Sequence, residues 1–167
     1  YKAYGMSNDA CVACANVLSN SVTAGTGSTF CECAGGYNLV SGTCQACATG
    51  FYKNPFGNES CTVCPEAFQT TVATGSNTIT QCVCTEGYAS TGKSGTAPCV
   101  ACAPGEYQPS QVNNVPCTDC STGGTTLSAA AWSPSLCIPE AGYYQAAEND
   151  FEVCAAGTHR PYDNQVG

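Results

Sequence analysis

Residues 82–102 read CVCTEGYASTGKSGTAPCVAC, and this stretch decides the fold. It joins a Cys-x-Cys pair, a Gly-Tyr dipeptide and a Cys-x-x-Cys pair through small and polar residues. Residues 31–47 follow the same order, and residues 137–154 follow it with two of the cysteines replaced. The chain is therefore a tandem array with a period of about 55 residues.

Cysteine is frequent in this chain, and large apolar residues are scarce. Cysteines number 16 of 167 residues, whereas Leu, Ile, Val and Phe together number 23, too few for one large core. Disulfides restrict the unfolded chain and typically stabilise a fold by roughly 2 to 4 kcal/mol each. We therefore predict small disulfide-rich repeats, arranged as an elongated tandem array of short two-stranded β ribbons and loops, with little helix and no large core.

The cysteine spacing divides the chain into three repeats and a remainder. Residues 1–46 form a partial first repeat, and residues 47–101 form the second. Residues 102–153 form a third repeat that lacks one disulfide. Residues 154–167 either start a further repeat or connect one subunit to the next.

The third repeat indicates how the cysteines pair. Pro139 and Phe151 stand where the other repeats have cysteine. Because the loss of one bonded cysteine alone leaves a free thiol, their joint loss suggests that these two positions bond each other. Pairing near neighbours throughout gives seven disulfides, although the sequence also allows nested pairings. The predicted pairs are Cys14–Cys31, Cys33–Cys44, Cys47–Cys61, Cys64–Cys82, Cys84–Cys99, Cys102–Cys117 and Cys120–Cys137.

Two cysteines, Cys11 and Cys154, are left over by this pairing. Their repeat equivalents place the partner of Cys11 upstream and the partner of Cys154 downstream. Two interpretations follow. Either the chain continues beyond both ends in the full protein, or Cys154 of one subunit bonds Cys11 of the next in a head-to-tail homopolymer.

The cysteine content also predicts the compartment and excludes several partners. Disulfides persist in oxidising surroundings, so we predict an extracellular protein, secreted or at the cell surface. We expect its signal peptide to be removed or to lie outside the numbered sequence. The net charge of −8 argues against nucleic acid, and this segment holds no apolar stretch that could span a membrane. Asn58-Glu59-Ser60 is an N-glycosylation sequon, so Asn58 is a candidate for a covalent glycan.

Four kinds of site chemistry compete with disulfides, and the sequence favours none of them. Cys-x-x-Cys pairs suit zinc or redox catalysis, but tandem pairs in a chain poor in Lys and Arg point to oxidised loops. His159 is the only histidine and has no neighbouring triad motif, so hydrolysis is not indicated. The aspartates lack the alternating spacing of a calcium loop. We predict no enzyme activity, no cofactor and no metal.

Aromatic residues recur just after glycine in each repeat. They can cover a disulfide or the joint to the next repeat, which we favour, or they can contact a ligand. Phe151 is expected to fill the space that a disulfide occupies elsewhere. The other residues of this set are Tyr37, Phe51, Tyr52, Tyr88, Tyr107, Tyr143 and Tyr144.

Three sequence elements carry a family resemblance. Cys-Ala-Pro-Gly-Glu-Tyr at 102–107, Thr-Gly-Ser at 74–76 ahead of Cys-Val-Cys at 82–84, and Gly-Tyr at 87–88 resemble the cysteine-rich GCC2/GCC3, or ephrin-receptor-like, repeats. They are also similar to tumour-necrosis-factor-receptor and EGF-like modules. The resemblance runs from Cys11 to about Tyr162. It implies the rod-like extracellular regions of adhesion proteins, receptors and surface filaments.

Together these features predict a structural role outside the cell. Our first hypothesis is a structural subunit of an extracellular filament, surface appendage or matrix, assembled end to end and glycosylated. The alternative is a ligand-binding or adhesion module of a cell-surface receptor ectodomain. An exposed aromatic patch on a monomer would favour the alternative, and regular contacts at both ends would favour the filament.

Overall fold

The computed structural model describes residues 12–159, except residues 24, 27, 29, 91, 93–94 and 112–114. The chain forms two compact units. Unit 1 comprises Tyr1–Val83 and Ser94–Thr96, and unit 2 comprises Cys84–Lys93 and Ala97–Gly167. The repeat boundaries predicted after residues 46, 101 and 153 are a different division of the chain and stay predictions.

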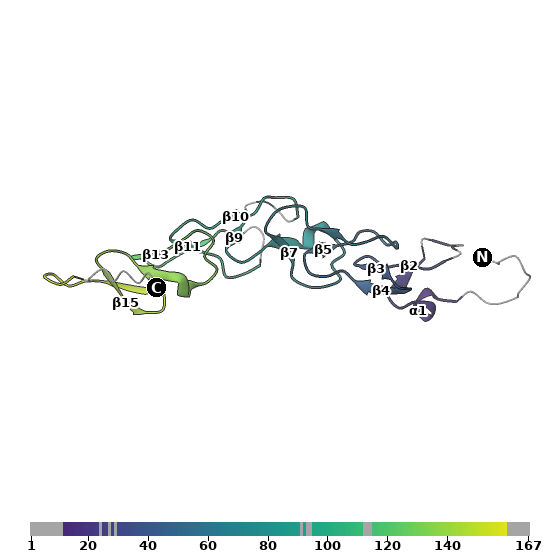
Figure 1. Cartoon of the computed structure of the whole chain (residues 1–167), viewed down its shortest axis with the longest axis horizontal. Helices are drawn as coiled ribbons and strands as arrows, with labels where there is room; N and C mark the ends of the chain where they lie inside the picture. Colours follow the sequence, from purple (N-terminus) through teal and green to yellow (C-terminus); the bar gives the residue numbers. More distant parts are fainter. Residues whose placement is uncertain are drawn as a thin grey trace, which may run out of the picture. The chain divides into compact units, whose positions relative to one another are not determined.

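Unit 1 consists of short strands paired two by two (Figure 1). Its helix is a single turn, and a 3₁₀ turn, η1, precedes the last strand. The pairs are β1–β2, β3–β4, β5–β6 and β7–β8. The bounds are α1 (Cys14–Val17), β1 (Ser21–Val22), β2 (Glu32–Cys33), β3 (Tyr37–Val40), β4 (Thr43–Ala46), β5 (Phe51–Tyr52), β6 (Thr62–Val63), β7 (Gln69–Thr71), η1 (Ile79–Gln81) and β8 (Cys82–Cys84), which ends at the first residue of unit 2.

Unit 2 repeats this construction. Its pairs are β9–β10, β11–β12, β13–β14 and β15–β16, all antiparallel. The bounds are β9 (Tyr88–Ala89), β10 (Val100–Ala101), β11 (Glu106–Tyr107), β12 (Thr118–Asp119), β13 (Gly124–Thr126), the 3₁₀ turn η2 (Pro134–Leu136), β14 (Cys137–Pro139), β15 (Tyr143–Ala147) and β16 (Asp150–Val153).

A tight turn joins the two strands of the β3–β4 ribbon. In the β3–β4 hairpin, Val40 pairs with Thr43, so only Ser41 and Gly42 form the turn. Both have positive φ, 47° and 79°. Two-residue turns of this kind match the twist of the strands that they join, and they favour small residues.

The buried interior of the repeats consists mainly of cysteine side chains. Of the described apolar residues, those that are buried are nine cysteines together with Ala131 and Phe151. By contrast, many large apolar side chains are exposed, among them Leu127 at 87% and Trp132 at 56%. Disulfides therefore take the place of a hydrophobic core. The predicted fold class of small disulfide-rich repeats, with two-stranded ribbons and little helix, is confirmed.

The structure has seven disulfides among the described residues, and each closes a loop along the chain. The bonded cysteines lie 11 to 18 positions apart. They are the same seven pairs that sequential pairing predicts, and no nested pair is present among the described cysteines. The bonds are Cys14–Cys31, Cys33–Cys44, Cys47–Cys61, Cys64–Cys82, Cys84–Cys99, Cys102–Cys117 and Cys120–Cys137.

Phe151 packs where the third repeat lacks a disulfide. Its side chain is 7% exposed and clusters with Cys120 and Cys137. The ring lies directly on β13, since a Cβ placed on Gly124 would be 2.2 Å from ring atom Cε2 of Phe151. Tyr107 and Tyr143 pack against the same cluster. An aromatic side chain thus fills this position, as the sequence predicts.

Candidate functional site

In unit 1, a set of backbone hydrogen bonds ties the Gly36 turn to the two loops that follow it. We call these residues the first junction. The Gly36 N–H donates to the Lys53 carbonyl (2.9 Å), and the Lys53 N–H donates to the Ser76 carbonyl (3.0 Å). The Cys47 N–H donates to the Gly36 carbonyl, and the Gly75 N–H donates to the Cys47 carbonyl, both at 2.8 Å. These bonds fix the joint between consecutive disulfide loops.

Unit 2 contains the same four hydrogen bonds, which we call the second junction. The Gly87 N–H donates to the Gln108 carbonyl (2.8 Å), and the Gln108 N–H donates to the Ala131 carbonyl (3.0 Å). The Cys102 N–H donates to the Gly87 carbonyl (3.0 Å), and the Ala130 N–H donates to the Cys102 carbonyl (2.8 Å). The junction is thus a property of the repeat.

Both junctions require glycine at one position. A Cβ placed on Gly36 would lie 2.1 Å from the Gly75 oxygen, and one on Gly87 would lie 2.4 Å from the Ala130 oxygen. Gly142 has the same place in the third repeat, where the Cys154 N–H donates to its carbonyl (2.8 Å). Among the described atoms, none lies within 4 Å of a Cβ placed there. The described residues thus show one of the four junction hydrogen bonds at Gly142.

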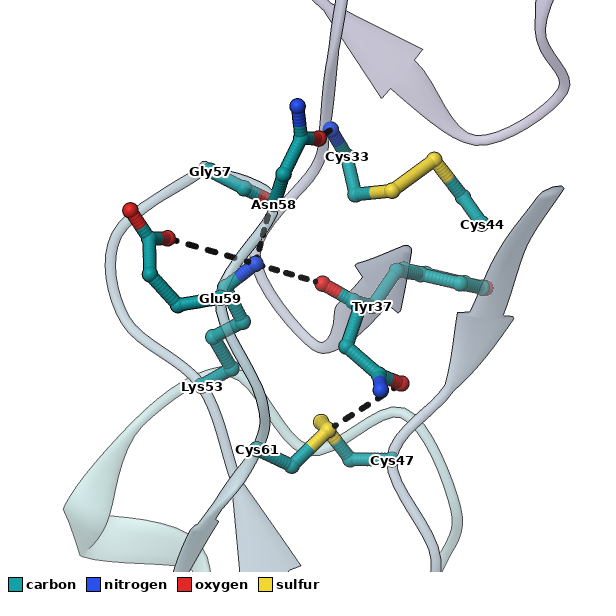
Figure 2. Close-up of polar contacts among 10 residues, drawn as sticks. Cys33, Tyr37, Cys44, Cys47, Lys53, Gly57, Asn58, Glu59 and Cys61 are labelled. Atoms are coloured by element: carbon teal, nitrogen blue, oxygen red, sulfur yellow. Dashed lines mark hydrogen bonds and ion pairs between the residues drawn. A yellow bond between two sulfur atoms is a disulfide. The ribbon is translucent and has the colours of Figure 1, made fainter. Parts of the chain in front are cut away.

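A buried cation lies at the first junction, as Figure 2 shows. Lys53 is 5% exposed, and its Nζ donates to the carbonyls of Tyr37 (2.9 Å) and Gly57. The Glu59 carboxylate is 3.8 Å away, but its side chain is 81% exposed. Because water screens an exposed ion pair, the two carbonyls dominate the binding of the ammonium. In the second junction, the equivalent residue is the neutral Gln108, whose Nε2 donates to the Pro116 carbonyl (3.2 Å).

Replacing Lys53 with methionine is expected to lower the free energy of unfolding of unit 1 by about 2 kcal/mol, because two carbonyls lose their buried donor. Lys53→Gln, which copies the second junction, should lose less, since a donor remains. Glu59→Gln should change stability by less than about 0.5 kcal/mol. Urea denaturation of the three oxidised variants measures these differences, and equal losses for Lys53→Met and Glu59→Gln would contradict this account.

Asn58, the predicted glycosylation residue, lies on the loop beside this cation. The residue is exposed, and its Oδ1 accepts a hydrogen bond from the Cys33 N–H (3.1 Å). Figure 2 shows its amide nitrogen, the atom that carries an N-linked sugar, directed away from the neighbouring labelled residues. The hydrogen bond to Cys33 uses the oxygen of the Asn58 amide, not the nitrogen.

On secretion from eukaryotic cells, the chain is expected to carry one N-linked glycan, removable by an amidase that cleaves at asparagine. Asn58→Gln and Ser60→Ala should both abolish the mobility shift, while Glu59→Gln keeps the sequon and should keep the shift. Ser60→Ala is the matched control, because it leaves the Asn58 hydrogen bond to Cys33 in place. A shift that survives Ser60→Ala would show that the sugar is attached elsewhere.

Two other residues singled out in the sequence, Cys154 and His159, are not part of the first junction. Cys154 is a free thiol of intermediate exposure, and Cys11 lies outside the described residues. His159 is exposed. Within the described part of the chain, no three or more His, Cys, Asp or Glu side chains gather in a way that could hold a metal. The described helices include none with the length and apolar character needed to cross a bilayer.

Among the described residues, Tyr144 is the titratable group whose pKa is clearly shifted. Its hydroxyl donates a hydrogen bond to the Glu152 carboxylate across the β15–β16 ribbon, and this bond raises the tyrosine pKa. The side chain is exposed, so the bond stabilises the ribbon only modestly. The contribution is present below the ordinary tyrosine pKa and is lost as pH rises through the raised value.

Comparison with known proteins identifies the repeat. A family profile described as "Tyrosine-protein kinase ephrin type A/B receptor-like" matches residues 36–82 and 87–137. Mouse (Mus musculus) "Sushi, von Willebrand factor type A, EGF and pentraxin domain-containing protein 1" is 35% identical over 132 residues, which are 77% of this chain and 4% of that protein. The Rattus norvegicus protein of the same name is 36% identical over 129 residues, 75% of this chain and 4% of that protein.

A receptor also matches. Ephrin type-A receptor 6 of Mus musculus is 41% identical over 58 residues, which are 35% of this chain and 5% of the receptor. The chain thus spans only about 4% to 5% of the length of these relatives. Receptor and EGF-containing relatives, together with the disulfides, place the chain outside the cell or at its surface. The chain belongs to the ephrin type A/B receptor-like family of cysteine-rich repeats.

Proposed function

We propose that this chain is a non-catalytic binding or adhesion module of a larger cell-surface or secreted protein, which contacts a protein or sugar ligand through its exposed loops. The observation that carries the proposal is the match of 98 residues, 36–82 and 87–137, to a receptor-like repeat family. The exposed loops of unit 2 add apolar contact surface, including Leu127 and Trp132. Exposed aromatic surface on a soluble fold is typical of interaction sites.

The test is a binding screen with the oxidised chain. The chain is displayed in multivalent form on beads and presented to a panel of purified recombinant extracellular domains and to a glycan array. Hits are then repeated with the monomeric chain by surface plasmon resonance. Saturable binding that disappears when the disulfides are reduced and alkylated supports the proposal. Absence of any such hit contradicts it.

End-to-end assembly, which the sequence placed first, becomes the second candidate, because the relatives favour a receptor-type module. One observation still favours end-to-end assembly. Cys154 is a free thiol, and its N–H donates to the Gly142 carbonyl as the Cys47 and Cys102 N–H groups donate to Gly36 and Gly87 in the two junctions. A second copy docking there would form a heterologous contact and extend into a filament. Non-reducing electrophoresis and electron microscopy decide: a ladder with filaments supports this candidate, and dispersed monomers with a reactive thiol contradict it.

A further inference from the structure

Unit 2 carries a shallow pocket beside the second junction. Thr85, Glu86, Gln111 and Trp132 line it, and its volume is about 330 Å³. Trp132 is the only tryptophan of the chain and is 56% exposed. The pocket therefore combines one aromatic surface with a carboxylate, an amide and a hydroxyl.

Hydrogen bonds at Gln108 fix the three segments that form this pocket. Gln108 is 2% exposed and binds the Gly87 N–H, next to Glu86, and the Ala131 carbonyl, next to Trp132. Its Oε1 accepts from the Ser110 N–H (3.3 Å), next to Gln111. Each of these neighbours is adjacent in the chain to a lining residue. These hydrogen bonds hold the pocket walls in place before a ligand binds. Binding therefore costs less conformational entropy.

The first junction shows that the fold does not need this pair of side chains. By repeat position, Glu86 corresponds to Gly35 and Trp132 corresponds to Asn77. The same four backbone hydrogen bonds form at both junctions, and in unit 1 a Cβ placed on Gly35 would lie 3.4 Å from the Asn77 Cβ. Unit 1 folds with neither a carboxylate nor an aromatic ring at this place. Glu86 and Trp132 are therefore free to serve a purpose other than folding.

The charge of unit 2 indicates which ligand suits the pocket. Unit 2 holds eight of the twelve acidic residues of the chain and two of its four permanent cations. Such a surface attracts cationic partners and repels anionic ones. An aromatic face beside a carboxylate binds a cation by combining cation–π attraction with an ion pair.

We propose that the Trp132 pocket binds an arginine side chain from a basic segment of a partner protein. The guanidinium group is planar and stacks on an aromatic ring, and its fork of donors can reach both the Glu86 carboxylate and the Gln111 amide oxygen. The compact lysine ammonium makes fewer of these contacts at once. The inference rests on the proposed binding function and deepens it by naming a site and the chemistry of its ligand.

Tryptophan fluorescence of the intact oxidised chain tests the site directly, since Trp132 is the sole tryptophan. Titration with the blocked peptide acetyl-Gly-Arg-Gly-amide should change the emission saturably, and added salt should weaken the effect. Acetyl-Gly-Gln-Gly-amide, acetyl-Gly-Glu-Gly-amide and a neutral trisaccharide should leave the emission unchanged. A saturable response to the sugar in place of the arginine peptide would overturn the proposal in favour of a carbohydrate site.

Matched variants separate the pocket from the net charge. Glu86→Gln should weaken arginine-peptide binding roughly two- to fivefold, whereas Glu148→Gln, which removes the same charge from an exposed turn of unit 2, should have no effect. In Trp132→Phe with Asn77→Trp, the tryptophan moves to the first junction and should not respond. Equal weakening by Glu86→Gln and Glu148→Gln, or an equal response of the moved tryptophan, would overturn the pocket.

The two proposals can fail separately. If the screen finds a partner whose binding is unaffected by Trp132→Ala and Glu86→Gln, the module binds elsewhere and only the pocket is lost. If the arginine peptide binds as expected but the screen finds no extracellular partner, the pocket chemistry stands and the proposed function is contradicted.

Discussion

Replacing Phe151 with alanine is expected to lower the free energy of opening of the third repeat by about 3 to 5 kcal/mol, the range for removing a large buried aromatic side chain. The ring lies on Gly124 and packs with Cys120 and Cys137. No disulfide closes this loop, so its opening is resisted mainly by packing. Hydrogen exchange of the β13 and β15 amides measures the loss, because exchange reports the opening of single elements.

Two variants control this experiment. Val153→Ala lies on the same strand, β16, and Val153 is 67% exposed, so it should change the opening free energy by less than about 0.5 kcal/mol. Pro139→Cys combined with Phe151→Cys copies the Cys84–Cys99 bond of the second repeat, and it should restore part of the protection that Phe151→Ala removes. Unchanged protection in Phe151→Ala would refute the role assigned to the ring.

The second large effect is expected at the glycine of the first junction. Gly36 has φ of 83°, and Gly142 has φ of 87°, so alanine is strained by roughly 1 to 2 kcal/mol at either place. At Gly36 the new Cβ would also meet a backbone oxygen, at 2.1 Å, whereas no described atom lies within 4 Å of a Cβ placed on Gly142. Gly36→Ala must therefore force the junction apart and should destabilise unit 1 by more than about 3 kcal/mol, whereas Gly142→Ala should show the strain alone.

Hydrogen exchange at the Cys47 and Gly75 amides measures this difference, since both amides donate hydrogen bonds within the first junction. Gly36→Ala should speed their exchange, and Gly142→Ala should leave it unchanged. Gly87→Ala should reproduce the loss at the Cys102 and Ala130 amides of the second junction. Equal effects of Gly36→Ala and Gly142→Ala would mean that backbone strain accounts for both. The close contact with the Gly75 oxygen would then make no contribution to the free energy of unfolding.

The sequence predicts the fold class well because the cysteine spacing carries it. Two-stranded ribbons, little helix and loops closed between near neighbours all follow from residues whose chemistry is local. The joint replacement at Pro139 and Phe151 also indicates which positions bond and which side chain takes over. These inferences need no knowledge of contacts between distant parts of the chain.

The junctions and the buried Lys53 could not be predicted in this way. Lysine in a polar loop is normally solvated, and Lys53 becomes buried because the carbonyls of Tyr37 and Gly57, from two separate loops, converge on its ammonium. Only the folded arrangement brings them together. The Trp132 pocket does have a signal in the sequence, because Glu86 and Trp132 align by repeat position with Gly35 and Asn77.

The order of the two functional hypotheses also shows a limit of cysteine patterns. Spacing reports how loops are closed and says little about what the loops contact. The unpaired Cys11 and Cys154 therefore weighed heavily toward end-to-end assembly, whereas the matched relatives include a receptor and a multidomain protein. Cys154 is a free thiol in the structure, while Cys11 lies outside the described residues.

Disulfide mapping of the native protein tests the central claim, that bonds between near neighbours along the chain replace a hydrophobic core. Glu-specific protease separates Cys31 from Cys33 by cutting after Glu32, and thermolysin separates Cys82 from Cys84 by cutting before Val83. Mass spectrometry should then find seven linked peptide pairs, including Cys33–Cys44, Cys64–Cys82 and Cys84–Cys99. Crossed or nested pairs, such as Cys61 with Cys82 or Cys47 with Cys82, or native protein in which these cysteines are reduced, would contradict it.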